Sequence, residues 1–202
     1  MEFIGSLAAL EQHYATPPSE AAMVKVARRL TPAYRRWIEQ SRFCVLSTIG
    51  PEGTDASPRG DDGPVVRVLD PGTLALPDWR GNNRIDSLRN IVRDGRVSLM
   101  FIVAGSHEVI RVNGTARLTA DLSLCESFAR AGKLPRTVAI VSIQEVYAQC
   151  ARALLRARLW TDGDLSLGLP TLGDMLAELS RGGIDGAAYD RAWPARASAS
   201  LW

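Results

Sequence analysis

The sequence contains few of the residues on which metal and hydrolytic chemistry depend. It has two histidines, His13 and His107, and three widely spaced cysteines, Cys44, Cys125 and Cys150, with no CxxC pair. Structural zinc sites need closely spaced Cys and His ligands, and a hydrolytic triad needs a base beside its nucleophile. Both kinds of site are therefore disfavoured. An odd number of isolated cysteines also indicates free thiols in a reducing compartment rather than a disulfide framework.

Aromatic residues are scarce, at 6%, and the net charge is only +2, from 24 basic and 22 acidic residues. Binding to single-stranded nucleic acid requires a basic groove with stacking aromatics, so this class is disfavoured. Lys25 and Lys133 are the only lysines, so nearly all the positive charge is arginine. Arginine's planar fork suits phosphate and carboxylate, although a GC-rich coding bias would produce the same composition.

Long apolar runs are missing as well. The first stretch, "MEFIGSLAALEQHY", lacks a basic region and is too short for a signal peptide or a membrane span, which predicts a cytoplasmic protein. With 202 residues and 46% hydrophobic residues, the chain is long enough for one sizeable core. We expect N-terminal packing helices over residues 1–41, a central domain over 42–160 and a helical extension over 161–202.

The first forty residues are predicted to be helical. Apolar residues at positions 23, 26, 27 and 30 have helical spacing, and Thr31-Pro32 has the form of an N-cap followed by a first-turn proline. Tyr34, Trp37 and Ile38 then form an apolar stripe that we interpret as packing surface. The tail from residue 171 is expected to hold one amphipathic helix, followed by an Ala/Ser-rich end, "ARASASLW", that frays or docks on a partner chain.

From Phe43 onward, short apolar runs separated by Gly, Pro and Asp predict strands and turns. "FCVLSTI", "VVRVL" and "TLAL" suggest an antiparallel meander, and "VSLMFIV" a strand buried on both faces. "EVIRVNGTARLTA" alternates strictly, with Gly114 placed for a bulge, and "TVAIVSIQEVYAQC" precedes a helical segment over 151–159. Six or seven strands with one internal helix predict a mainly β fold with peripheral helices (α+β), an antiparallel closed or split β-barrel.

The internal helix is expected over residues 83–94. Ile85, Leu88 and Ile91 have helical spacing, Gly95 follows in the position of a C-terminal cap, and Asn83 is the natural N-cap. A helix start presents unpaired N–H groups, so Asn82, Asn83 and Arg84 would suit a phosphate. The alternative is that Asn83 only caps the helix and that Arg84 is solvated. A first-turn arginine opposes the helix dipole unless an anion lies nearby.

A second polar cluster, "DASPRGDDGP", follows the first strands. Arg59, between Pro58 and Gly60, could present a bidentate guanidinium to the same phosphate. The alternative is an ordinary Asp/Gly-rich hairpin turn with a surface arginine.

The order of "SPRGDDGPVVRVLD", "LPDWRGNNR", a helix, "DGRVSLMF" and "EVIRVNGTARL" resembles the pyridoxamine 5′-phosphate oxidase family of FMN-binding split barrels, closest to a bacterial branch of uncharacterised flavin proteins. The resemblance is clear over about residues 42–120 and weaker at "YAQCARALLRARLW". It implies FMN as cofactor and a homodimer with flavin at the subunit interface.

The resemblance also implies which residues would hold FMN. Asn82, Asn83 and Arg84 correspond to the family's phosphate site, and Arg59 to a further phosphate-binding arginine. Pro77 and Asp78 correspond to contacts with the flavin or its ribityl chain. Arg158 and Trp160 would approach the flavin ring from the partner subunit.

The chain departs from the true vitamin B6 oxidases in its substrate residues. "RARLW" lacks the family's Arg-x-His histidine, "VVRVL" lacks a lysine, and Val109 replaces a flavin-contacting glutamine. Pyridoxamine phosphate is therefore a disfavoured substrate. The sequence predicts an FMN-dependent oxidoreductase acting on an unknown small molecule, with no assigned catalytic side chain. The alternative is a non-catalytic protein that stores or senses flavin, or that binds haem through His107.

Overall fold

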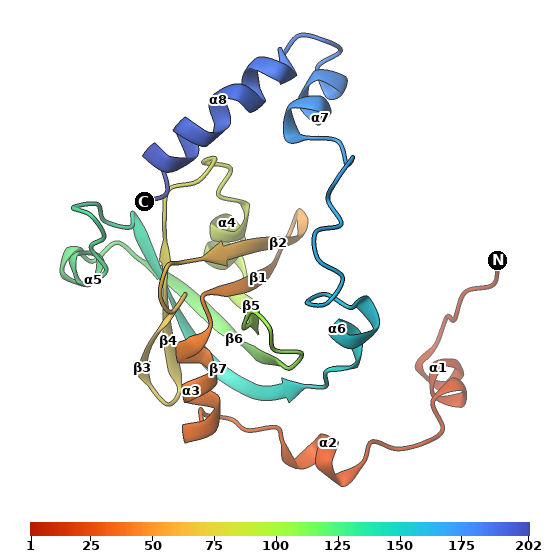
Figure 1. Ribbon diagram of the computed structural model, residues 1–202. Coiled ribbons are helices and arrows are strands. Elements are labelled where there is room, and N and C mark those ends of the chain that lie inside the picture. Colours follow the sequence, from red (N-terminus) through yellow and green to blue (C-terminus); the bar gives the residue numbers. More distant parts are fainter.

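The centre of the computed structural model, which describes all residues 1–202, is one antiparallel sheet of seven strands (Figure 1). The strands are β1 (Phe43–Gly50), β2 (Gly53–Gly60), β3 (Arg67–Asp70), β4 (Thr73–Asp78), β5 (Arg96–Ile102), β6 (Val109–Thr119) and β7 (Thr137–Gln149). Their order in the sheet is β2-β1-β5-β6-β7-β4-β3. The sheet curls without closing, with β2 and β3 as its edges, and the predicted split barrel is thereby confirmed.

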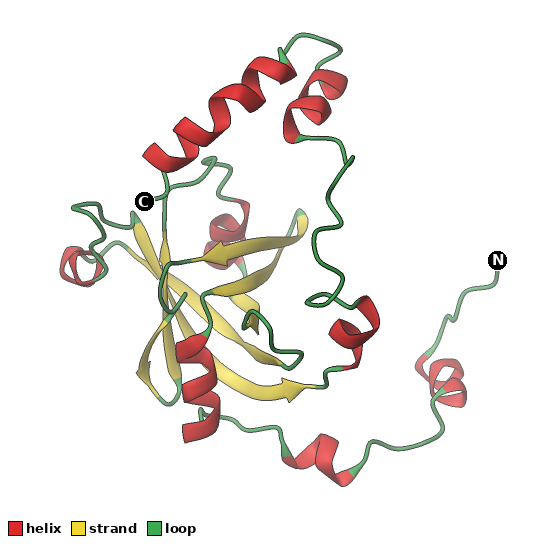
Figure 2. Cartoon of the chain, viewed as in Figure 1, coloured by secondary structure: helices red, strands yellow, loops and turns green.

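The chain also forms eight helices. They are α1 (Leu7–His13), α2 (Glu20–Val24), α3 (Pro32–Gln40), α4 (Asp86–Arg93), α5 (Leu122–Ser127), α6 (Arg152–Ala157), α7 (Leu172–Leu179) and α8 (Gly186–Ala199). Of these, α3, α4 and α5 pack against strands, whereas α1 and α2 lie away from the sheet along an extended N-terminal segment (Figure 2). None of them combines the length and the apolar composition that crossing a membrane requires.

The core lies inside the curl of the sheet. The alternation predicted for β6 is observed: Ile110, Val112 and Ala116 are buried, whereas Arg111, Asn113 and Thr115 are only partly covered. Phe101 of β5 and Ile38 of α3 are fully buried in the same cluster. Full burial of such a side chain contributes about 1.5–3 kcal/mol. The alternation of apolar residues along the strands therefore determines which face of the sheet forms the core.

Gly114 marks the bulge that the sequence predicted. The register between β6 and β7 shifts between Asn113 and Gly114. A Cβ atom on Gly114 would lie 2.0 Å from the carbonyl oxygen of Ser142, so only glycine fits against β7 at this point. The bulge lets the two long strands bend around the core.

Three predictions about the strands were wrong. The hairpin turn given as the alternative for residues 55–64 is wrong for the first part of that cluster, because residues 53–60 form edge strand β2, paired with β1 along its whole length. The first strands are not one meander, because the β1–β2 and β3–β4 hairpins lie at opposite edges of the sheet. Strand β5 is buried on one face only, since Met100 is exposed between the buried residues Leu99 and Phe101.

The N-terminal region follows the prediction in part. Thr31 caps α3, its hydroxyl accepting the Tyr34 N–H at 3.2 Å, with Pro32 in the first turn. The helix predicted across residues 23–30 is wrong, because α2 ends at Val24 and Ala27 forms a β-bridge with Val146. Pairing with strand β7 outweighs the helical spacing there.

The tail also differs from its prediction. It holds two helices, α7 and α8, and the Ala/Ser-rich stretch expected to fray is part of α8 up to Ala199. The two helices form a tight hairpin, in which a Cβ atom on Gly173 would lie 2.2 Å from the carbonyl oxygen of Gly186. Asp190 accepts hydrogen bonds from the Thr171 hydroxyl and from the Gly173 N–H. Two helices, joined by paired glycines and by the bonds of Asp190 to the start of α7, thus replace the single amphipathic helix.

Candidate functional site

The main cavity, of about 710 Å³, opens between edge strand β2, the end of β4 and the start of α4. Its volume is in the range of small-molecule and cofactor pockets. Six of the eight residues predicted to bind cofactor line it: Arg59, Pro77, Asp78, Asn82, Asn83 and Arg84. Strand β2 and the segment after β4 are distant in sequence but adjacent in space, so the sheet topology creates this cavity.

Arginine dominates the polar lining. Four arginines and three aspartates contribute to the wall: Arg59, Arg80, Arg84 and Arg136, with Asp55, Asp78 and Asp86. Four guanidinium groups against three carboxylates leave the wall with a formal net charge of +1, and two of the arginines, Arg59 and Arg84, are paired with aspartates. Guanidinium groups are well suited to a phosphate or carboxylate ligand.

Arg59 and Asp78 form an ion pair across the cavity. The Arg59 Nη1 atom donates to Asp78 Oδ1 at 2.6 Å, and both side chains are 19% exposed. The Nε atom of Arg59 is buried and has no hydrogen-bond partner, and the same holds for the hydroxyl oxygen of Thr137. Both residues line the cavity. Because buried polar groups are rarely left unpaired, a polar ligand is the expected partner.

The start of α4 differs from its predicted form. The helix begins at Asp86, and Ile85 rather than Asn83 is its N-cap, with no side-chain hydrogen bond. The prediction of an Asn83 cap is therefore wrong. Asn83 and Ile85 instead adopt left-handed backbone conformations, with φ of 61° and 53°. A β-branched residue in this conformation is an outlier, of a kind that clusters at ligand sites.

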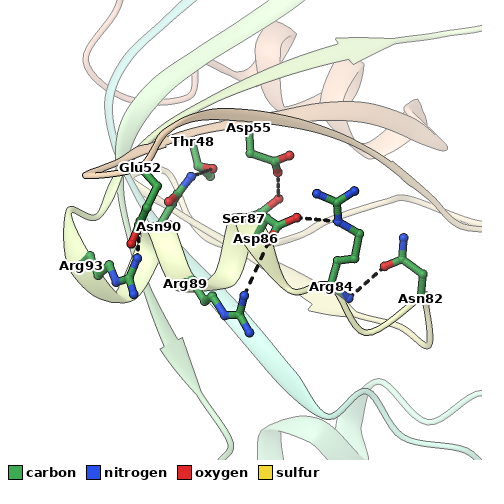
Figure 3. A network of polar contacts seen from close by, with 10 residues as sticks. All are labelled: Thr48, Glu52, Asp55, Asn82, Arg84, Asp86, Ser87, Arg89, Asn90 and Arg93. Atoms are coloured by element: carbon green, nitrogen blue, oxygen red, sulfur yellow. Dashed lines mark hydrogen bonds and ion pairs between the residues drawn. The ribbon is translucent and has the colours of Figure 1, made fainter. Parts of the chain in front are cut away.

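A polar network holds this loop in place (Figure 3). The Arg84 N–H donates to Asn82 Oδ1 at 3.0 Å, and the Arg84 guanidinium pairs with Asp86 at 2.9 Å. A positive charge at the start of a helix is unfavourable, and here the Asp86 carboxylate compensates the charge of Arg84. Arg84 precedes the helix, and its side chain is 78% exposed. A ligand phosphate would compete with Asp86 for this arginine.

Buried polar contacts fix α4 onto the sheet below the cavity. The Ser87 hydroxyl donates to Asp55 of β2, and Asn90 donates to the Thr48 hydroxyl of β1 at 3.1 Å. Ser87 and Asn90 are both buried. These contacts, drawn in Figure 3, orient the first turn of α4. Residues of that turn line the cavity. The uncapped N–H groups of that turn are available to an anion.

Arg136 and Thr137 were missed by sequence reasoning. Arg136 donates to Asn83 Oδ1 at 2.9 Å and so links the start of β7 to the Asn82–Arg84 loop. Pro77 and Asp78 are the register partners of Val138 and Thr137. In the sequence, Arg136 is only an arginine that precedes a predicted strand. It reaches the cavity through the pairing of β4 with β7, which no local sequence pattern reveals.

Arg158 and Trp160 do not line the cavity within this chain. Arg158 pairs with Asp162 at 3.2 Å, and the Trp160 indole N–H donates to the Ser106 carbonyl oxygen at 2.7 Å. His107 lies in the same β5–β6 turn as Ser106, away from the main cavity. A role for Arg158 and Trp160 across a subunit interface stays a prediction.

Asp61 lies beside the cavity and anchors one of its walls. Its side chain is only 4% exposed and accepts the Trp79 indole N–H at 3.1 Å. Burial raises the pKa of Asp61 above its usual range. Trp79 lines both the main cavity and a neighbouring cavity of about 560 Å³. Asp61 therefore fixes the orientation of the side chain that stands between the two.

The family model for pyridoxamine 5′-phosphate oxidase matches residues 30–150, more than half of the chain. The protein belongs to the pyridoxamine 5′-phosphate oxidase family. This match covers the whole sheet and the main cavity except for Leu201, and it leaves α7 and α8 outside.

Solved structures similar to this chain include a putative pyridoxamine 5′-phosphate oxidase from Lactobacillus delbrueckii, at 24% identity and a TM-score of 0.49, covering 60% of this chain and 95% of that one. HupZ from Group A Streptococcus is 18% identical, with a TM-score of 0.47 and coverage of 59% and 93%. General Stress Protein 26 from Bacillus anthracis is 17% identical, with a TM-score of 0.43 and coverage of 56% and 88%. No curated protein gives a significant match.

Proposed function

We propose that this protein binds FMN in the main cavity and acts as a flavin-dependent oxidoreductase on a small molecule. The observation that carries the proposal is the pair of unpartnered buried polar atoms, Arg59 Nε and Thr137 Oγ1, in a cavity of cofactor size with an arginine-rich wall. Membership of the pyridoxamine 5′-phosphate oxidase family supports the flavin as the group that satisfies them.

Different residues of the cavity would bind different parts of FMN. Arg84, Asn83 and the first turn of α4 would hold the phosphate, and Arg59 would contribute its free Nε N–H. Asp78 holds the Arg59 guanidinium in place, and Arg136 does the same for Asn83. FMN supplies the hydride-transfer chemistry, so the chain needs no nucleophile of its own. A homodimer, with Arg158 and Trp160 reaching the partner's flavin, completes the proposal.

The first test is the visible spectrum of the protein purified without added cofactor, followed by identification of what denaturation releases. FMN should be found, and the flavin should bleach on addition of NADH or NADPH if the protein is an enzyme. A flavin that binds but is reduced by no donor favours a storage or sensing role. No FMN after purification, together with no binding of added FMN, would sink the proposal.

Arg84→Ala tests the phosphate contact. A lost charge-assisted hydrogen bond costs about 1.5–3 kcal/mol, so FMN affinity should fall about 10- to 150-fold. Riboflavin, which lacks the phosphate, should lose little affinity, because the substitution removes nothing that it contacts. Isothermal titration with both ligands measures the difference, with Arg89→Ala on the exposed face of α4 as the matched control. An equal loss for FMN and riboflavin would contradict the assignment.

A further inference from the structure

The end of the chain reaches the main cavity. Leu201 is part of the cavity wall, although it lies about fifty residues beyond the part of the chain that matches the family. The next residue, Trp202, meets Trp79 edge to face, with ring centroids 5.1 Å apart and an interplanar angle of 74°. This is a favourable geometry for an aromatic pair. The Trp79 indole N–H in turn donates to Asp61.

The α7–α8 hairpin that carries this segment is a unit of its own. Its two helices pack chiefly against each other, through the Gly173–Gly186 contact and the bonds to Asp190. Residues 161–170, which join it to the barrel, are all exposed. Figure 1 shows α8 running from α7 back toward the sheet, so that the chain end lies beside the strands.

Few contacts hold the hairpin to the barrel near the cavity. They are the Trp79–Trp202 pair, the Leu201 position in the wall, and a hydrogen bond of 3.3 Å from Lys133 Nζ to the Ala199 carbonyl oxygen. Leu201 is 63% exposed, so this contact is shallow. A rigid unit on an exposed linker with a shallow contact can detach without disturbing the core.

We propose that Leu201 and Trp202 form a detachable wall of the ligand cavity, a latch that closes on Trp79 and that must release for a ligand to enter or leave. The α7–α8 hairpin carries the latch, and Asp61 holds Trp79 in the orientation that receives it. The ligand part of this inference rests on the proposed flavin site, whereas the latch contact itself does not.

Trp202→Ala tests the latch, with FMN as the probe in stopped-flow measurements. Release and entry of FMN should both become faster, by about 2- to 10-fold, the range that an aromatic pair of this kind contributes. Trp202→Phe keeps an aromatic edge and should stay near the parent. Trp193→Ala is the matched control, because Trp193 is an exposed tryptophan of α8 stacked on Tyr189. It should leave both rates unchanged.

Hydrogen exchange of the protein without ligand separates this inference from the proposed function. Peptides covering residues 76–81 and 130–136 should exchange faster in Trp202→Ala than in the parent and in Trp193→Ala. If neither the parent protein nor any variant binds FMN, the proposed flavin site is wrong. The hydrogen-exchange result alone then shows whether Trp202 closes on Trp79. Unchanged exchange, unchanged release, faster release with unchanged entry, or an equal effect of Trp193→Ala would each overturn the latch.

Discussion

At the scale of single residues, the three cysteines show how the fold sets the chemistry of identical side chains. Cys44 is fully buried in β1, and burial raises the pKa of its thiol to about 12, against a smaller opposing effect of Arg59. Cys125 belongs to α5 and is buried against Ala75 and Val138 of the sheet. Cys150 is exposed at the end of β7, and a hydrogen bond from the Arg152 N–H lowers the pKa of its thiol.

We predict that one thiol of the native protein reacts with Ellman's reagent and that three react after denaturation. The reason is that the thiolate is the reactive form, and only Cys150 is both accessible and readily deprotonated. Cys150→Ser should abolish the native reaction, and Cys125→Ser should leave it unchanged. Two fast-reacting thiols in the folded protein would contradict the burial of Cys44 and Cys125.

Asp94 provides a pH-dependent prediction at the same scale. Hydrogen bonds from the Arg96 side chain and N–H lower the pKa of this carboxyl from 3.8 to about 2. A lowered pKa in the folded state gives stability that is present above about pH 4 and lost as the pH falls toward 2. Asp94→Asn should therefore destabilise the protein at pH 7 and progressively less below pH 4.

Urea unfolding at a series of pH values measures this effect. Glu126→Gln is the control, because the Glu126 side chain is exposed on α5 and forms no ion pair. A destabilisation by Asp94→Asn that stays constant, or that grows on acidification, would show that the ion pair with Arg96 is not the cause.

At the scale of elements, the Gly114 bulge is the most demanding position of the sheet. A side chain there would meet the Ser142 backbone, which cannot rotate away as a side chain can. Gly114→Ala should therefore cost about 3 kcal/mol, at the upper end of overpacking, and lower Tm by about 6–12 °C. Calorimetry measures the shift. Gly5→Ala, which nothing opposes within 4 Å, should leave Tm unchanged, and a similar Tm for both variants would refute the clash.

The elements also show what sequence could predict. Local signals predict several elements: short apolar runs predict β1, β4 and β7, apolar alternation predicts β6, and a Thr-Pro cap predicts α3. Strand β2 could not be recognised, because its polar residues Asp55, Ser57 and Arg59 face a cavity or solvent and leave no apolar alternation. The α4 boundary was missed by three residues, because the left-handed Asn83 and Ile85 break the helix where spacing alone continues it.

The candidate site was predicted to a similar extent. Six of the cavity residues lie in segments whose order resembles the family, so the sequence alone was enough to assign them to one site. Arg136, Thr137 and Leu201 reach the cavity only through the β4–β7 pairing and the return of α8. Such contacts join segments more than fifty residues apart, and no local pattern encodes them.

At the scale of the whole molecule, the proposed homodimer determines whether the site is complete in one chain. Arg158 and Trp160 lie outside the cavity in their own chain and pair with Asp162 and Ser106. Apolar side chains of α1 and α7, such as Leu7 and Leu179, are exposed. If Arg158 and Trp160 serve the partner's flavin, each site is shared between two subunits.

Co-expression of two defective chains tests this sharing. One chain carries Arg84→Ala and the other Trp160→Ala, with different affinity tags so that the mixed dimer can be isolated. If the residues act across the interface, one of the two sites in the mixed dimer contains both parental residues, and the other lacks both. The mixed dimer should then retain about half of the parental flavin through gel filtration. If they act within one chain, both sites carry one defect each, and the mixed dimer should hold no more flavin than the average of the two homodimers.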